Sequence, residues 1–200
     1  MKEKFINNYL NIVMNNKSQL SEEDIEKFKY AIEGIYLTIT KLLVIITLGL
    51  VLNILKEIVI VLLFYNFLRF FGFGYHAKGS KECLFISLIF FVLFPLLVTK
   101  EILSFKYQIP LFILCIFNFL LFAPSDTKKR PMINKKKKLK RKVFTICVTL
   151  IYFVLCLKLN NKLSNLILLG TLIEAIMVNP IIYKITGQPY NNYKNYLKEN

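Results

Sequence analysis

Two residues of this sequence, His76 and Cys83, could together perform nucleophilic chemistry, because histidine can act as the base that activates a cysteine thiol. They lie in a polar segment that contains three glycines. On one straight helix their seven-residue separation would place the side chains roughly 10 Å apart along the axis, too far for a hydrogen bond. We therefore expect the segment to fold back, with Gly72, Gly74 and Gly79 supplying the backbone freedom.

A helix is predicted to follow this polar segment. The apolar run begins at Leu84, and Ser80 is a typical N-cap residue for it. This assignment places Cys83 in the first helical turn, where free backbone N–H groups and the helix dipole favour an anion. Lys78 adds positive charge, so the sequence predicts a Cys83 thiolate with His76 as its base. The alternative is that a histidine and a cysteine meet near this helix start by chance.

The other three cysteines, Cys115, Cys147 and Cys156, lie in apolar stretches without a histidine or a second cysteine at metal-ligand spacing. We expect them to pack as small hydrophobic side chains. We predict no metal site and no cofactor, since the glycines of the polar segment do not form a nucleotide-binding pattern either.

The composition indicates an all-α polytopic integral membrane protein. Of 200 residues, 56% are apolar, and roughly 45 to 50% is typical of soluble domains. We expect about six transmembrane helices, at about 30–52, 54–71, 84–99, 109–123, 143–159 and 163–183. The second stretch starts with Lys56 and Glu57 and the third contains Pro95, so one or two could be re-entrant; four crossings with two re-entrant segments are the alternative. We predict a single membrane-embedded domain over residues 1–200.

Residues 3–14 repeat apolar side chains at the helical period, which predicts an amphipathic helix within residues 1–20. This helix could lie on the membrane surface or pack against a second subunit, and we expect a homodimer. Lys41 and Glu174 fall inside predicted spans, where a charge needs a partner.

The basic residues are distributed unevenly between the two sides of the membrane. If both termini are cytoplasmic, that side receives most of the cations, including ten between residues 128 and 142. The other side receives only Lys56, Lys100, Lys106, Lys158 and Lys162. This asymmetry predicts a multi-pass plasma-membrane protein with His76 and Cys83 on the cytoplasmic side. The net charge of +15 points to anionic lipid rather than to nucleic acid as a partner.

Residues 124–142 form a predicted basic cytoplasmic loop that begins at Pro124. The loop could serve as a topology signal that binds anionic lipid, or it could recognise an acidic peptide. The cations that we assign to substrate binding are Arg69, Lys78, Lys128, Lys129, Arg130, Lys135 and Lys136.

Two segments, GYHAK followed by Cys83 and APSDTKKRP at 123–131, resemble signature blocks of the accessory gene regulator B (AgrB-like) family. The resemblance covers the whole chain in length and hydropathy and is concentrated in these two blocks. It implies a membrane cysteine endopeptidase that cuts a precursor signal peptide and promotes formation of a cyclic thiolactone, the autoinducing peptide of quorum sensing.

The resemblance also implies a precursor with an acidic C-terminal tail, which the basic loop could hold. Cys83 would expel this tail and form an acyl-enzyme thioester, with His76 as base. The position of Asp126 in the second block suggests that it orients His76, and Ser80 is a second candidate for such a supporting role. Two alternatives remain open: a non-enzymatic membrane transporter or scaffold subunit, and a lipid acyltransferase that uses the same nucleophile.

Overall fold

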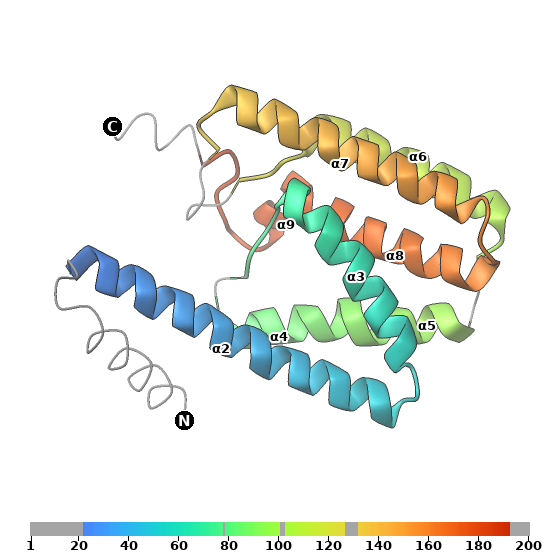
Figure 1. Cartoon of the computed structure of the whole chain (residues 1–200), viewed down its shortest axis with the longest axis horizontal. Coiled ribbons are helices and arrows are strands. Elements are labelled where there is room, and N and C mark those ends of the chain that lie inside the picture. The colour runs from blue at the N-terminus through green and yellow to red at the C-terminus, as the bar shows by residue number, and fades with distance from the viewer. Residues whose placement is uncertain (1–21, 78, 101–102, 127–131, 193–200) are drawn as a thin grey trace. The chain divides into compact units, whose positions relative to one another are not determined.

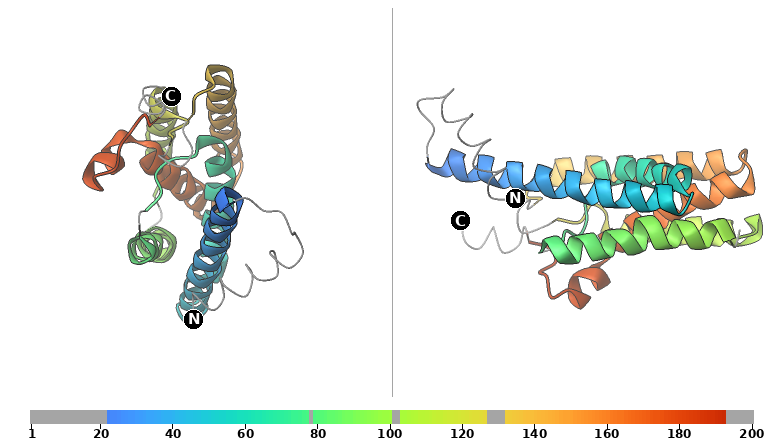
Figure 2. Two further views of the ribbon diagram at one scale, coloured as in Figure 1. Left: turned by 90° about the vertical axis from the view of Figure 1, so that its left-hand side faces the viewer. Right: turned by 90° about the horizontal axis from the view of Figure 1, so that it is seen from below.

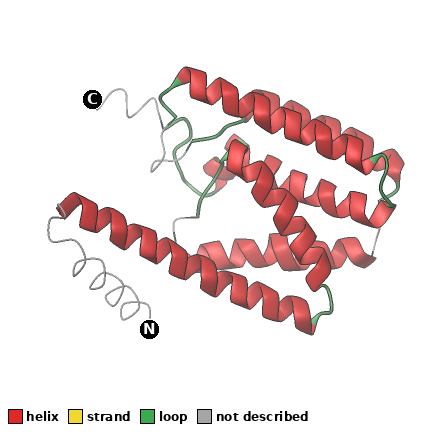
Figure 3. Ribbon diagram, viewed as in Figure 1, coloured by secondary structure: helices red, strands yellow, loops and turns green. Residues whose placement is uncertain are grey.

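A computed structural model describes residues 22–77, 79–100, 103–126 and 132–192. Within these residues the regular structure is helical and no strand occurs, which confirms the all-α prediction (Figures 1 and 3). The predicted amphipathic helix of residues 1–20 lies outside the described residues. The helices are α2 (Glu22–Val51), α3 (Leu55–Gly72), α4 (Ser80–Leu88), the π-helical turn η1 (Ile89–Leu93), α5 (Phe94–Lys100), α6 (Phe105–Phe122), α7 (Lys135–Cys156), α8 (Asn161–Val178) and α9 (Pro180–Ile185).

Four of the described helical segments are long and apolar enough to cross a membrane: Ala31–Val51, Ser80–Lys100, Phe105–Phe122 and Asn161–Val178. Helices α3 and α7 coincide with two further predicted stretches and carry several charged residues. The chain divides into two units, residues 1–51 and 52–200. Helix α2 is the described part of the first unit, and the candidate site lies wholly within the second.

Helix α8 is the central helix of the second unit, where it packs against α3, α5, α6 and α7. Thirteen of its 18 residues are buried, so apolar side chains surround it on all sides. Gly170 allows α3 to come close, because a Cβ there would lie 3.1 Å from the carbonyl oxygen of Val61. A side chain at this position would therefore have to displace the backbone of α3 by a few tenths of an ångström.

Two ion pairs define the relative direction of α3 and α8. Near the start of both helices, Lys162 Nζ lies 2.6 Å from Glu57 Oε1. Near the end of both, Arg69 Nη1 lies 3.4 Å from Glu174 Oε2. The two helices therefore run parallel. The helices between them in the sequence connect the end of α3 to the start of α8. We call the end with Arg69 the site end; it contains residues 73–77, 79–83, 123–126, 132–142 and 174–192.

The third predicted stretch is one continuous helical rod from Ser80 to Lys100, despite Pro95 (Figure 2). A proline ring clashes with the carbonyl four residues earlier in a regular α-helix and removes one N–H donor. The π-helical turn directly before it relieves this conflict: the N–H of Phe94 donates to the carbonyl of Ile89, five residues back. Pro95 therefore does not end the helix.

The basic segment differs from the predicted loop of residues 124–142, because α7 already begins at Lys135. The Asn134 side chain accepts a hydrogen bond from the backbone N–H of Lys137 at 3.1 Å, which caps the helix. Lys135 through Lys142 consequently form the first two turns of α7 rather than a loop.

Candidate active site

The two sequence blocks that contain His76 and Asp126 are joined directly by backbone hydrogen bonds. The N–H of Gly74 donates to the carbonyl of Ser125 at 3.2 Å, and the N–H of Ser125 donates to the carbonyl of Gly72 at 3.1 Å. These bonds form an isolated parallel bridge between Phe73 and Ser125. Residues some fifty positions apart in sequence therefore build one site.

His76 lies within the connection between α3 and α4, and Cys83 follows it at the start of α4. His76 is exposed, and its backbone carbonyl accepts a hydrogen bond from Gln188 Nε2 at 2.8 Å. Cys83 is half-buried in the first turn of α4, where its N–H donates to the carbonyl of Gly79 at 2.9 Å. Residues 73–77 are not helical and α4 begins at Ser80, so His76 and Cys83 do not share one straight helix, while a direct contact between them stays a prediction.

The residues directly before His76 and Cys83 are hydrogen-bonded to each other, since the Tyr75 hydroxyl donates to Glu82 Oε1. Tyr75 is only 2% exposed, and its N–H donates to the carbonyl of Met177 at 2.7 Å. Burial and the bond to Glu82 raise the pKa of Tyr75 to about 12. The phenol is thus protonated at neutral pH and serves as a donor that closes the loop.

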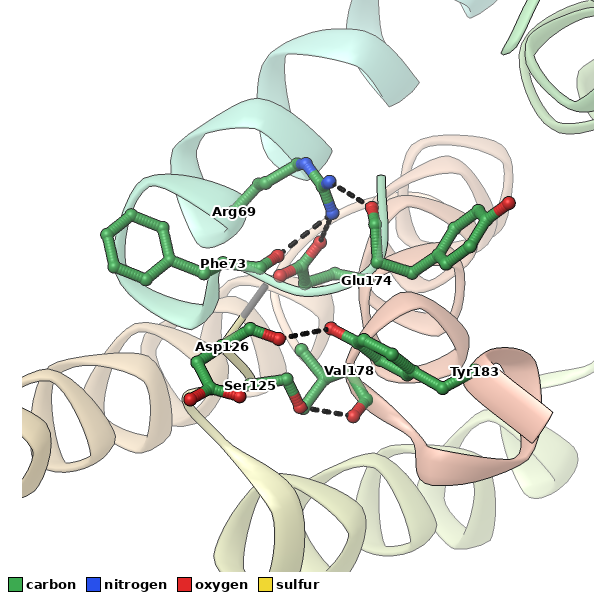
Figure 4. A network of polar contacts seen from close by, with 8 residues as sticks. Arg69, Phe73, Ser125, Asp126, Glu174, Val178 and Tyr183 are labelled. Atoms are coloured by element: carbon green, nitrogen blue, oxygen red, sulfur yellow. Dashed lines mark hydrogen bonds and ion pairs between the residues drawn. The ribbon is translucent and has the colours of Figure 1, made fainter. Parts of the chain in front are cut away.

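Arg69 and Glu174 form the buried centre of the site (Figure 4). Glu174 is fully buried, and the sequence expectation that it needs a partner is met by Arg69. The Arg69 guanidinium also donates to the backbone carbonyls of Phe73, at 2.9 Å, and Tyr75. The assignment of Arg69 to substrate binding stays a prediction, while these contacts assign it a structural role as well.

Asp126 is buried and accepts hydrogen bonds from two backbone N–H groups, those of Asn192 at 2.9 Å and Met132 at 3.4 Å. Its own carbonyl accepts a bond from the Tyr183 hydroxyl at 3.2 Å (Figure 4). Asp126 therefore ties the segment after α8 to the segment before α7. Its predicted role in orienting His76 stays a prediction.

Ser80 does not occupy the N-cap position that the sequence predicts. Gly79 is the N-cap of α4, with an extended backbone, and Ser80 is the first helical residue. The reason is the bond from the Cys83 N–H to the Gly79 carbonyl, which starts the helical ladder one residue earlier. Cys83 remains in the first turn all the same.

Among the predicted substrate-binding cations, Lys135 and Lys136 are exposed on the first turn of α7. Arg141 on the same helix was missed, because nothing in the sequence separates it from its basic neighbours. Its guanidinium donates to the carbonyl of Phe70 at 2.8 Å and lies 4.1 Å from the ring centroid of Phe73. Lys78, Lys128, Lys129 and Arg130 lie outside the described residues.

A cavity of about 260 Å³ opens beside His76. It brings His76 and Arg69 together, whereas Cys83 is not part of its lining. The lining residues are Asn66, Arg69, Phe70, Phe73, Gly74, His76 and Ser125. The mixture of aromatic, amide and cationic groups suits a peptide segment, because such a segment presents both apolar side chains and carbonyl groups.

Comparison with a family model and with known proteins points to the same protein family. The family described as AgrB, Accessory gene regulator B, matches residues 6–178. An AgrB-like protein of Listeria innocua is 34% identical over 177 residues, which cover 88% of this chain and 86% of that protein. An AgrB-like protein of Clostridium acetobutylicum is 32% identical over 187 residues, covering 92% and 88%.

A third relative is named accessory gene regulator protein B and comes from Staphylococcus saprophyticus. It is 30% identical over 170 residues, which cover 85% of this chain and 89% of that protein. No solved structure matches the chain.

Proposed function

Because the chain belongs to the accessory gene regulator B family, which is linked to quorum sensing, we propose that it is a membrane-embedded cysteine endopeptidase acting on a precursor signal peptide. The observation that carries the proposal is the Tyr75–Glu82 hydrogen bond, which joins the residues directly before His76 and Cys83. This bond supports the placement of a base and a nucleophile close to each other, as cysteine catalysis requires.

In the proposed first step, His76 takes the proton of the Cys83 thiol, and the thiolate attacks the carbonyl carbon of the scissile peptide bond. The carbon–nitrogen bond then breaks, and His76 returns the proton to the leaving amine. The products are the free C-terminal tail and an acyl-enzyme thioester on Cys83. No external oxidant or reductant is involved, so the step balances with the groups present.

In the proposed second step, a thiol of the bound N-terminal fragment attacks the thioester carbonyl. The bond to Cys83 breaks, the thiolate is regenerated, and the fragment closes into a thiolactone. Exchange between a thioester and a thiol is nearly balanced in free energy, whereas converting an amide into a thioester is unfavourable. Removal of the cleaved tail or of the thiolactone product therefore has to drive the two reaction steps forward.

The start of α7 is proposed to hold the acidic tail of the precursor. Cations at a helix N-terminus meet the positive end of the helix dipole, which is unfavourable unless an anion is present. Lys135, Lys136 and Lys137 are exposed there, and Arg141 connects the same helix to Phe73 of the site loop. Anionic lipid is the competing ligand for these lysines.

The test is cleavage of a synthetic precursor by the purified protein in liposomes. We expect Cys83→Ala to release no tail, and His76→Ala to lose about 10²- to 10⁴-fold in kcat, the usual contribution of a general base. Cys147→Ala is the matched control, because this cysteine is exposed on α7, and it should cleave normally. Full activity of Cys83→Ala would contradict the proposal.

A further inference from the structure

Glu174 occupies a position where a charge requires an explanation. Its side chain is fully buried within α8, a helix apolar enough to span a membrane, and it contacts Arg69 of α3. The desolvation of two charges often exceeds what their attraction returns, so a buried ion pair is by itself weak support for stability. The pair also orients the donors of Arg69 that bind other groups.

The remaining donors of Arg69 are directed at the loop before His76 (Figure 4). One guanidinium nitrogen donates to the carbonyl of Phe73 and the other to the carbonyl of Tyr75. The guanidinium is planar and its donors form a rigid fork, so one orientation of this group determines where both carbonyls lie. His76 is the next residue along the chain.

The loop backbone itself requires such support. Phe73 has a φ of +59°, a left-handed conformation that residues with a Cβ rarely adopt. Gly74 also has a positive φ, +104°, and a Cβ there would lie 2.7 Å from the Met177 carbonyl and 3.2 Å from the Arg69 guanidinium. The loop therefore keeps this conformation only if its surroundings hold it.

The loop is also fitted directly against Glu174. A Cβ on Gly72 would lie 2.7 Å from Glu174 Oε1, so the absence of a side chain makes room for the carboxylate. Among the described residues this oxygen has no hydrogen-bond partner, so Arg69 is the partner that the structure gives the carboxylate. The carboxylate, the guanidinium and the loop thus form one packed unit.

We propose that Glu174 is a positioning residue for His76 and acts through the Arg69 guanidinium, which it holds against the carbonyls of Phe73 and Tyr75. This inference rests on the proposed function, because it assigns the role of Glu174 within the same peptidase site. Without the carboxylate the guanidinium loses its ion-pair partner and is held by the ring of Tyr65 and by the two loop carbonyls alone, so we expect its hydrogen bonds to the loop before His76 to weaken.

The first experiment compares Glu174→Gln with Glu57→Gln, which removes a carboxylate from the other α3–α8 ion pair, at the far end of both helices. We expect Glu174→Gln to lower kcat by about ten- to a hundred-fold, the order expected when a catalytic group is misplaced by about 1 Å, with little change in KM. Glu57→Gln should retain wild-type kcat. Equal kinetics for the two variants would overturn the proposal.

The second experiment does not depend on peptide cleavage. In protein whose other three cysteines are replaced, the rate of Cys83 alkylation by iodoacetamide is measured against pH, because only the thiolate reacts. Glu174→Gln should shift this profile towards that of His76→Ala, and the double variant should match His76→Ala alone. A shift of equal size in the His76→Ala background would mean that Glu174 acts by another route.

Arg69→Lys keeps the positive charge beside Glu174 but cannot donate to two carbonyls in a fixed plane. It should reproduce both effects of Glu174→Gln, and it decides the question if Glu174→Gln does not fold. An Arg69→Lys protein with wild-type kcat and alkylation profile would overturn the proposal. If Cys83→Ala still cleaves the precursor, the proposed function fails, while the alkylation profiles still report whether Glu174 positions His76.

Discussion

Tyr75 and Glu82 are hydrogen-bonded to each other across the loop that contains His76, and they have the same seven-residue spacing as His76 and Cys83. Each residue of this second pair directly precedes one of the first pair in the sequence, although only His76 and Cys83 have side chains typical of nucleophilic catalysis. The bond shows how the loop is closed: a buried, protonated phenol donates to a carboxylate in the first turn of α4.

Replacing Tyr75 by phenylalanine should therefore lower activity without removing either catalytic group. We expect kcat to fall by about ten-fold or more, because small displacements of catalytic groups have effects of this order, and KM to change little. Tyr107→Phe is the control, since this tyrosine of α6 is exposed. A Tyr75→Phe enzyme as active as the control would show that the bond does not support the site.

The four cysteines should differ sharply in importance. Cys115 and Cys156 are buried, and Cys147 is exposed on α7, so none of the three belongs to the loop. A variant with all three changed to alanine should keep kcat within about two-fold of wild type while losing some thermal stability, as small core truncations do. Loss of cleavage in a correctly inserted triple variant would contradict Cys83 as the sole nucleophile.

A covalent intermediate should accumulate when the second step is blocked. If the cyclising cysteine of the precursor is replaced by alanine, only water can deacylate Cys83, and water is a poorer nucleophile than thiolate at neutral pH. Intact-mass analysis should show an adduct equal to the N-terminal fragment, removable by hydroxylamine and absent in Cys83→Ser. Rapid tail release without any adduct would favour direct hydrolysis.

The first turn of α7 should influence binding more than chemistry. Changing Lys135, Lys136 and Lys137 to glutamine should raise KM for the full precursor by about ten-fold, since exposed ion pairs contribute about 0.2 to 1 kcal/mol each. The kcat should change much less, and added salt should reproduce the effect by screening. Lys158→Gln, beyond the other end of α7, is the control. An equal loss with a tailless peptide would assign these lysines to lipid.

The site loop and the basic helix should face the same side of the membrane. Single cysteines at Gly79 and Lys135 should resist a membrane-impermeant reagent applied to intact cells, whereas a cysteine at Ser104 should react. Both positions lie at the site end, which the asymmetry of basic residues predicts to face the cytoplasm. Labelling of Gly79→Cys from outside would reverse the assigned orientation.

The helical fold could be predicted because the sequence contains apolar stretches, bordered by charged residues, that are long enough to form membrane helices. The candidate dyad stays a prediction, and the sequence points to it because His76 is the only histidine and Cys83 the only cysteine in a polar segment. The Arg69–Glu174 pair could not be predicted, since the two residues are 105 positions apart and only the packing of α3 on α8 brings them together. Glu174 was recognisable as a charge in need of a partner, yet nothing in the sequence names that partner.

The basic segment shows a different limit of sequence interpretation. A run of lysines is compatible both with a helix, because lysine has a high helix propensity, and with a solvated loop. The deciding residue was Asn134, whose side chain caps α7, and which could have been recognised as a helix start. The role of Arg141 remained hidden, because it depends on the carbonyl of Phe70 and the ring of Phe73, which belong to a distant segment.

The π-helical turn at Ile89–Leu93 also allows the rod from Ser80 to Lys100 to hold one extra residue. Each residue of an α-helix advances the side-chain direction by about 100°. Helix α5, beyond the turn, packs against α3 and α8, whereas α4, before it, carries Cys83. An extra residue kept in regular α-helical geometry would therefore turn α4 by about 100° relative to α5, whereas the wide turn takes up that residue within one hydrogen-bonded turn and leaves the direction of Cys83 nearly unchanged. The wide turn thus absorbs a residue between the half of the rod that is anchored in the bundle and the half that carries the thiol.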